Sequence, residues 1–125
     1  MSPAADPPDV LVVDDNPDAA EVLALLIGTE GFSTATAHGV AQAREQIARQ
    51  RPRMIFLDLH LPDGSGMELL AELKADQLSA GIEVVVLSGL MEDALKEQAH
   101  LLGASAFLLK PLDPEQLTAL LTRAR

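Results

Sequence analysis

The apolar and polar positions of the chain alternate between two patterns, short strand-like runs and longer stretches with helical spacing. The clearest run covers residues 54–57 and leads directly into Asp58, which is followed by the turn signal of residues 61–64. A continuous apolar run of this length indicates a strand that is covered on both faces, as in a parallel sheet. Asp58 would then stand at the carboxyl edge of that sheet, where open α/β sheets bind ligands.

Five strands and five helices are expected in strict alternation. The predicted strands cover residues 10–13, 32–37, 54–58, 82–87 and 104–109. The predicted helices run from about 17 to 30, 40 to 50, 65 to 74, 90 to 102 and 113 to 122. This alternation predicts an α/β domain with a mainly parallel sheet and five βα units. The second strand alternates small polar and apolar residues, so we expect it at a sheet edge.

Local signals predict where the helices begin and which faces they bury. Asn16 precedes Pro17 as an N-cap, and Ser65 with Glu68 forms a capping box. Helical spacing predicts buried faces for three of the helices. They consist of Ala19, Val22, Leu23 and Leu26 in the first helix, Ala43 and Ile47 in the second, and Met91, Ala94, Leu95, Ala99 and Leu102 in the fourth.

Length and composition limit the classes of protein to consider. The 125 residues suffice for one domain, expected over residues 9–125 after a proline-rich, disordered lead-in of residues 1–8. No cysteine is present, which excludes disulfides and zinc–thiolate sites. A net charge of −10 argues against direct binding to nucleic acid or anionic lipid. No membrane span or export leader is visible, so a cytoplasmic location is expected.

Four of the five predicted strands end at a residue that can take part in chemistry. Asp14 and Asp15 follow the first strand, Asp58 ends the third, Ser88 follows the fourth and Lys110 follows the fifth. Each of these residues alone is most simply a turn or surface residue. Because the ends of parallel strands lie on one edge of a sheet, their joint occurrence there favours a functional site.

The charges of this site indicate its chemistry. Three carboxylates and one lysine leave a formal charge of about −2, which a divalent cation would offset. Oxygen ligands with room for water suit Mg²⁺, and magnesium held in this way usually also binds a phosphate oxygen. A metal, a cation and a hydroxyl around one carboxylate fit phosphoryl transfer, with Asp58 as the nucleophile that forms an aspartyl phosphate.

In this order, these residues resemble the receiver domain of bacterial two-component response regulators, such as the chemotaxis regulators, over residues 9 to about 123. The resemblance implies a flavodoxin-like, doubly wound (βα)5 fold whose parallel sheet has the strand order 2-1-3-4-5. It also implies a signalling domain that catalyses only its own phosphorylation and dephosphorylation. The donor would be a histidine kinase or a phosphotransfer protein, and the acceptor would be Asp58.

The resemblance also assigns roles around the acceptor. The Mg²⁺ ligands would be Asp14 (largely through water), Asp15, Asp58 and the backbone carbonyl of His60. Ser88 and Lys110 would hold the phosphoryl oxygens, and the bond between Lys110 and Pro111 is expected to be cis. The positions that tune phosphate lifetime in the family are His60 and Leu90, and because members vary at both, the lifetime is left open.

A switch is implied as well. Phe107 stands where receivers carry a rotating aromatic ring, and Gly89 leaves it space beside Ser88. Ser88 and Phe107 would carry the signal to the fourth helix, the last strand and the last helix. That face would be offered to a downstream protein or to a second copy of the chain.

Three alternatives accompany this interpretation. A haloacid-dehalogenase-like phosphatase also uses an Asp nucleophile, but with an Asp-x-Asp arrangement where this chain has Asp58-Leu59-His60. A flavin-binding flavodoxin-like module needs a phosphate cradle after the first strand, where the two acids, Asp14 and Asp15, would repel phosphate. We expect a stand-alone receiver because the chain begins with a methionine, and the alternative is a piece of a larger response regulator or hybrid kinase.

Overall fold

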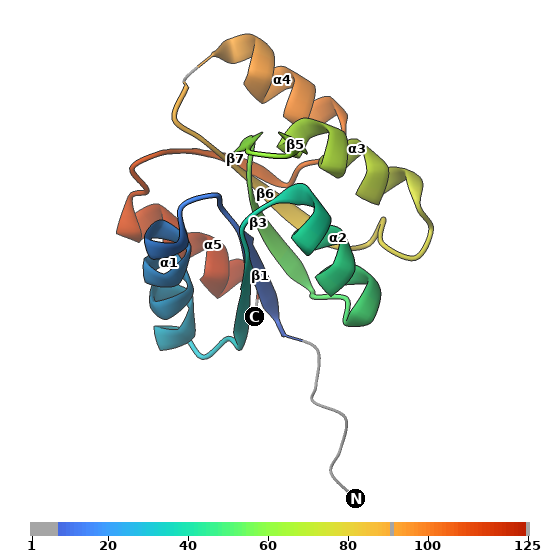
Figure 1. The fold of residues 1–125 in the computed structure, drawn as a ribbon. Coiled ribbons are helices and arrows are strands. Elements are labelled where there is room, and N and C mark those ends of the chain that lie inside the picture. Colours follow the sequence, from blue (N-terminus) through green and yellow to red (C-terminus); the bar gives the residue numbers. More distant parts are fainter. Residues whose placement is uncertain (1–7, 91, 125) are drawn as a thin grey trace, which may run out of the picture.

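Five parallel strands form the central sheet of the computed structural model, which describes residues 8–90 and 92–124 (Figure 1). They are β1 (Val10–Val13), β2 (Thr34–Ala37), β3 (Met54–Asp58), β6 (Glu83–Ser88) and β7 (Ala106–Leu109). Their order is β2-β1-β3-β6-β7, and every pairing is parallel. This order is the predicted 2-1-3-4-5, so the flavodoxin-like fold is confirmed, and β2 lies at an edge as expected.

Helices cover both faces of this sheet (Figure 1). They are α1 (Pro17–Thr29), α2 (Val40–Arg49), α3 (Gly66–Ala75), α4 (Asp93–Leu101) and α5 (Pro114–Ala124). One apolar core joins the sheet to α1 and α5, and a second core joins it to α2, α3 and α4. Alternate residues of β3 serve different cores, because Phe56 faces the first core whereas Ile55 and Leu57 face the second.

Several local predictions are confirmed. Asn16 caps α1, since its Oδ1 accepts the backbone N–H groups of Asp18 and Ala19. The hydroxyl of Ser65 caps α3 by accepting the N–H of Met67. The predicted core residues of α2, Ala43 and Ile47, are buried. None of the described helices has the length and the apolar character that a membrane crossing requires.

The predicted buried face of α1 is wrong at three of its four positions. Leu23 is buried, but Ala19 is exposed, and Val22 and Leu26 are 57% and 43% exposed. The residues that α1 does bury are Ala20, Leu23 and Ile27. This helix is apolar on several sides, so hydrophobic spacing alone did not single out the side that the sheet covers.

The fourth helix is shorter than predicted. It begins at Asp93, after the N-cap Glu92, instead of at residue 90. Of its predicted core residues, Met91 lies outside the described residues, Ala99 is buried, Leu95 and Leu102 are partly buried, and Ala94 is exposed. The predicted lead-in of residues 1–8 also lies outside the described residues, apart from Pro8.

A short hairpin between β3 and α3 was not predicted as a pair of strands. Its two strands are β4 (His60–Leu61) and β5 (Gly64–Ser65), which pair antiparallel. The predicted turn of residues 61–64 forms the tip of this hairpin. The hairpin begins two residues after Asp58, so it leaves the sheet at its carboxyl edge.

Candidate functional site

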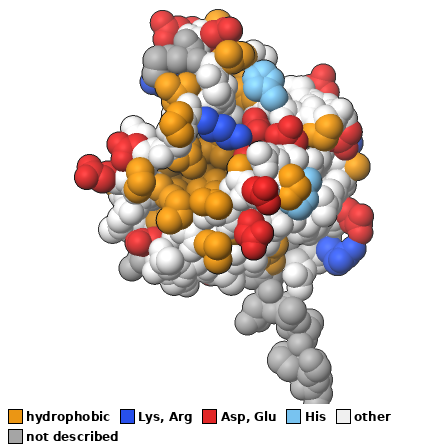
Figure 2. All heavy atoms as spheres, turned by 60° about the vertical axis from the view of Figure 1, so that its left-hand side comes forward, with side chains coloured by type: hydrophobic (Ala, Val, Ile, Leu, Met, Phe, Trp, Pro, Cys, Tyr) orange, Lys and Arg blue, Asp and Glu red, His pale blue; other side chains and the backbone are white. Residues whose placement is uncertain are grey.

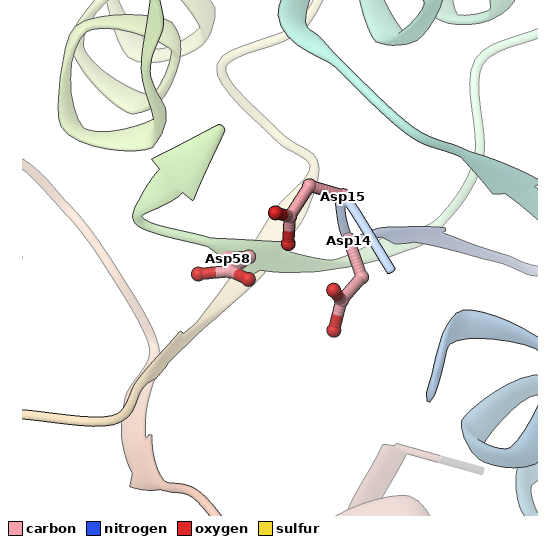
Figure 3. A group of neighbouring side chains, drawn as sticks. All are labelled: Asp14, Asp15 and Asp58. Atoms are coloured by element: carbon pink, nitrogen blue, oxygen red, sulfur yellow. The ribbon is translucent and has the colours of Figure 1, made fainter. Parts of the chain in front are cut away.

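The three predicted carboxylates converge at the carboxyl edge of the sheet. Val13 of β1 pairs with Leu57 of β3, so the next residues, Asp14 and Asp58, leave the sheet side by side. One carboxylate oxygen from each of Asp14, Asp15 and Asp58 lies within 4.8 Å of the other two. Figure 3 shows the three side chains gathered where β1 and β3 end. Asp14 and Asp58 are only 3% and 4% exposed, whereas Asp15 is exposed to solvent.

Backbone donors orient the two buried carboxylates. The N–H of Asn16 donates to Oδ1 of Asp14 at 3.0 Å, in the turn that leads from β1 into α1. The N–H of His60 donates to Oδ1 of Asp58 at 3.0 Å, in the turn that opens the β4–β5 hairpin. Each buried carboxylate is therefore held by the residue two positions after it, which leaves its second oxygen for the centre of the site.

Lys110 joins these second oxygens. Its Nζ donates to Oδ2 of Asp14 at 2.8 Å and to Oδ2 of Asp58 at 2.9 Å. Burial, the largest single effect, opposes the charge of the ammonium, but the hydrogen bonds and the negative charges of Asp14 and Asp58 together outweigh it and raise the pKa of Lys110 above its ordinary value. The lysine is therefore a cation throughout the physiological range. Its bond to Pro111 is cis, as expected.

The donor set of the site suits a hard divalent cation. Two buried carboxylates and one exposed carboxylate supply oxygen ligands, and the side near Asp15 is open to water. One ammonium offsets only one of the three negative charges, so the cluster carries a formal charge of about −2. Adding a divalent cation there would remove the remaining repulsion.

Ser88 lies at the same edge but does not point its hydrogen bonds toward the carboxylates. It is fully buried at the end of β6, where its neighbour Leu87 pairs with Asp58. Its hydroxyl accepts the N–H of Leu90 at 3.0 Å and donates to the Leu90 carbonyl at 3.2 Å. Ser88 thus ties the backbone of Leu90, where the fourth helix was predicted to begin, to the end of β6.

Phe107 occupies the position expected of the switch residue. It lies in β7, where it pairs with Val86 of β6, and is partly buried against the core that contains α2, α3 and α4. A Cβ added to Gly89 would meet no atom within 4 Å, and Gly89 is itself exposed to solvent. The rotation of the Phe107 ring stays a prediction.

Comparison with known proteins identifies the family. The family model for the response regulator receiver domain matches residues 10–122 of the chain. The chain belongs to the response regulator receiver family. As a receiver domain it is a signalling domain rather than a classical enzyme, and the phosphatase and flavin-binding alternatives do not apply.

Relatives of this receiver domain include transcriptional regulators. The phosphate regulon transcriptional regulatory protein PhoB of Pseudomonas aeruginosa is 34% identical over 110 residues, which are 88% of this chain and 48% of that protein. The response regulator protein PilR of the same organism is also 34% identical, over 91% of this chain and 25% of that protein. The chain thus spans half or less of the length of these relatives.

Solved receiver structures superpose closely on this receiver domain. A response regulator receiver protein from Pseudomonas putida has a TM-score of 0.86 and 32% identity, covering 98% of this chain and 100% of that chain. A response regulator protein from Burkholderia pseudomallei, solved with a phosphorylated aspartic acid, a calcium ion and citrate, has a TM-score of 0.81 and 33% identity, covering 90% of this chain and 65% of that chain. Both structures share more than 30% of their aligned sequence with this chain, so the similarity includes the sequence as well as the fold.

One contact of the hairpin that follows Asp58 was not predicted from the sequence. The sequence places Asp63 in a turn, and the structure shows that its carboxylate also accepts the N–H groups of Val40 and Ala41 at the start of α2. The sequence offered only a weak signal, Gly39, since a helix that begins after glycine has no N-cap side chain of its own.

Proposed function

We propose that this receiver domain takes a phosphoryl group from the phosphohistidine of a histidine kinase or phosphotransfer protein onto Asp58. The observation that carries the proposal is the convergence of Asp14, Asp15 and Lys110 on Asp58. Asp58 alone both ends the central strand and contacts the lysine at the edge where α/β sheets bind ligands. The proposal also places this receiver domain in the cytoplasm, together with its phosphoryl donor.

The transfer is a substitution at phosphorus. A carboxylate oxygen of Asp58 forms the new O–P bond while the P–N bond to the donor histidine breaks, and its electron pair returns to the imidazole nitrogen. Charge accumulates on the three equatorial oxygens during this step, so fixed positive groups lower its barrier. Lys110 is such a group, since its ammonium already lies 2.9 Å from Asp58.

Mg²⁺ is the metal that fits the donor set. Its protein ligands would be the carboxylates of Asp14, Asp15 and Asp58 and the backbone carbonyl of His60, with Asp14 acting largely through water. When bound, the ion would supply further neutralisation of the phosphoryl oxygens. The backbone N–H of His60 already donates to Oδ1 of the acceptor Asp58. This bond holds His60 beside the acceptor and supports a role for this residue at the site.

Ser88 would sense the phosphoryl group. To donate its hydroxyl to a phosphoryl oxygen, it must give up the hydrogen bond that it donates to the Leu90 carbonyl. Leu90 leads into α4, so the exchange would release the start of that helix. Phe107 would then turn into the space beside Gly89, and the surface of α4, β7 and α5 would change. A phosphoryl group biases this equilibrium only through contacts that differ between the two states.

The output surface would be the face formed by α4, β7 and α5. Apolar side chains gather in a hollow on the side of the molecule shown in Figure 2, with acidic side chains around it. A downstream protein or a second copy of the chain would bind this face. The relatives PhoB and PilR are at least twice as long as the part that matches this chain. The assignment of an output to this face is therefore proposed for the receiver domain itself.

Phosphorylation with a small donor tests the acceptor. Incubation with acetyl phosphate and Mg²⁺ should add a single base-labile phosphate, seen as one mass increment, and Asp58→Asn should abolish it. Asp76→Asn removes an exposed acid outside the site and should leave labelling unchanged. Equal labelling of Asp58→Asn and the unmodified protein would refute the assignment.

A further inference from the structure

The first turn of α2 is capped by a residue from another part of the chain. Its N-cap is Gly39, which provides no side-chain hydrogen bond. Asp63, at the tip of the β4–β5 hairpin, accepts the N–H of Val40 on Oδ1 at 2.7 Å and the N–H of Ala41 on Oδ2 at 3.0 Å. Both carboxylate oxygens are therefore used, and the charge lies at the positive end of the helix dipole.

The fit between the hairpin tip and α2 is close on both sides. A Cβ added to Gly39 would lie 2.8 Å from Oδ1 of Asp63, closer than real Cβ contacts allow. A Cβ added to Gly64, the neighbour of Asp63, would lie 3.1 Å from Cγ2 of Val40. Glycine at both positions leaves room for the side chains of Asp63 and Val40, so the tip of the hairpin packs closely on the start of α2.

The base of the same hairpin is the candidate metal site. His60, the first residue of β4, donates its N–H to Asp58, and its carbonyl is the backbone ligand in the proposed function. Where the chain leaves the hairpin after β5, the N–H of Gly66 donates to the Leu59 carbonyl at 3.0 Å and closes the base of the hairpin. A Cβ on Gly66 would overlap the Asp58 carbonyl oxygen. Residues 59–65 thus span from the acceptor to α2, with Asp63 as the far anchor.

We propose that Asp63 is a positioning residue for the metal site, because it anchors the hairpin that carries the His60 peptide. This inference rests on the proposed function, in which that peptide is a Mg²⁺ ligand. Without Asp63, the hairpin would sample other positions, and metal binding would have to order it first. Coupling is reciprocal, so Mg²⁺ should in turn strengthen the contact between Asp63 and α2.

Loss of Asp63 would act on the hairpin more than on α2. The helix keeps its buried residues, Ala43 and Ile47, and is also tied to α3 by Arg44 and Glu72. The guanidinium of Arg44 donates to both carboxylate oxygens of Glu72, at 2.6 and 2.8 Å. This second link makes Glu72→Gln a matched control, since it weakens a contact of the same helix without touching the hairpin.

The test is Mg²⁺ titration followed by amide NMR. In Asp63→Ala the dissociation constant for Mg²⁺ should rise about ten-fold, the range seen when a partner of a metal ligand is removed. In Glu72→Gln it should stay within about two-fold of the unmodified protein, because Glu72 contacts Arg44 and neither a metal ligand nor the hairpin. The rate of labelling by acetyl phosphate should return nearly to normal at saturating Mg²⁺ in Asp63→Ala, because only the ordering of the site has changed.

A second readout needs no variant. In the unmodified protein, Mg²⁺ should slow the hydrogen exchange of the Val40 and Ala41 amides, which donate to Asp63. Unchanged exchange there, or equal Mg²⁺ affinity in Asp63→Ala and the unmodified protein, overturns the role of Asp63 and leaves the metal site intact. Absence of Mg²⁺ binding in the unmodified protein overturns the proposed metal site as well.

Discussion

Nζ of Lys110 lies 2.9 Å from Oδ2 of Asp58, although the two residues are 52 positions apart. The same ammonium lies 2.8 Å from Oδ2 of Asp14. Both oxygens belong to carboxylates that the proposed Mg²⁺ site would use. Lys110 is therefore both the counterion of the metal-free site and a competitor of the metal.

Replacing Lys110 by methionine separates these two roles. Lys110→Met should lower the melting temperature of the metal-free protein, because two buried carboxylates lose their counterion. The same change should tighten Mg²⁺ binding by about ten-fold, equivalent to about 1.4 kcal/mol, by removing a like charge near the metal. Thermal melts and Mg²⁺ titrations check both effects. Lys96→Met, on the exposed side of α4, should change neither, and weaker Mg²⁺ binding in Lys110→Met would contradict the competition.

Mg²⁺ should stabilise the unmodified protein. A ligand of the native state present at a hundred times its dissociation constant adds about 2.7 kcal/mol, which is roughly 10 °C for a domain of this size. Asp15→Asn should raise the metal-free melting temperature, because it relieves repulsion with Asp14 and Asp58, and should abolish the magnesium effect. Melts with Mg²⁺ and with EDTA measure both. A melting temperature that Mg²⁺ leaves unchanged in the unmodified protein would count against the site.

Ser88→Ala should uncouple phosphorylation from the output surface. The variant should still be labelled at Asp58, more slowly. It lacks the hydroxyl that would leave the Leu90 carbonyl and donate to a phosphoryl oxygen instead. Amide NMR over residues 88–112, with and without beryllofluoride as the phosphoryl analogue, reports the switch. Ser105→Ala, at an exposed serine, is the control. Shifts confined to the loops around Asp15 and Asp58 in the unmodified protein would refute this route.

Asp63 gives stability a dependence on pH. The N–H groups of Ala41 and Val40, and less strongly Arg44, lower the pKa of Asp63 below its ordinary value. A carboxyl group with a lowered pKa in the fold stabilises above its unfolded pKa, and this contribution is lost as pH falls through its folded pKa. Urea unfolding should therefore show Asp63→Asn less stable than the unmodified protein at neutral pH, with the difference shrinking on acidification. If the difference in stability between Asp63→Asn and the unmodified protein did not change with pH, the effect would come from the shape of the side chain and not from its charge.

The arrangement of elements was predictable because it depends on local signals. The run that ends at Asp58 and the caps at Asn16 and Ser65 all involve residues that are close in sequence. Placing Asp14 and Asp58 together required only one further rule, that the ends of parallel strands meet at one edge. The sequence by itself thus determined the βα order and the membership of the acidic cluster.

Other features depended on partners far away in the chain. Which side of α1 is buried was decided by the sheet, because Ala20 and Ile27 face it whereas the equally apolar Val22 does not. The cap that α2 lacks at Gly39 comes from Asp63, 23 residues beyond Val40. No local pattern encodes such a pairing, because its energy exists only after the β4–β5 hairpin and α2 have been brought together. The tertiary structure alone therefore decided which side of α1 is buried and how the β4–β5 hairpin is joined to α2.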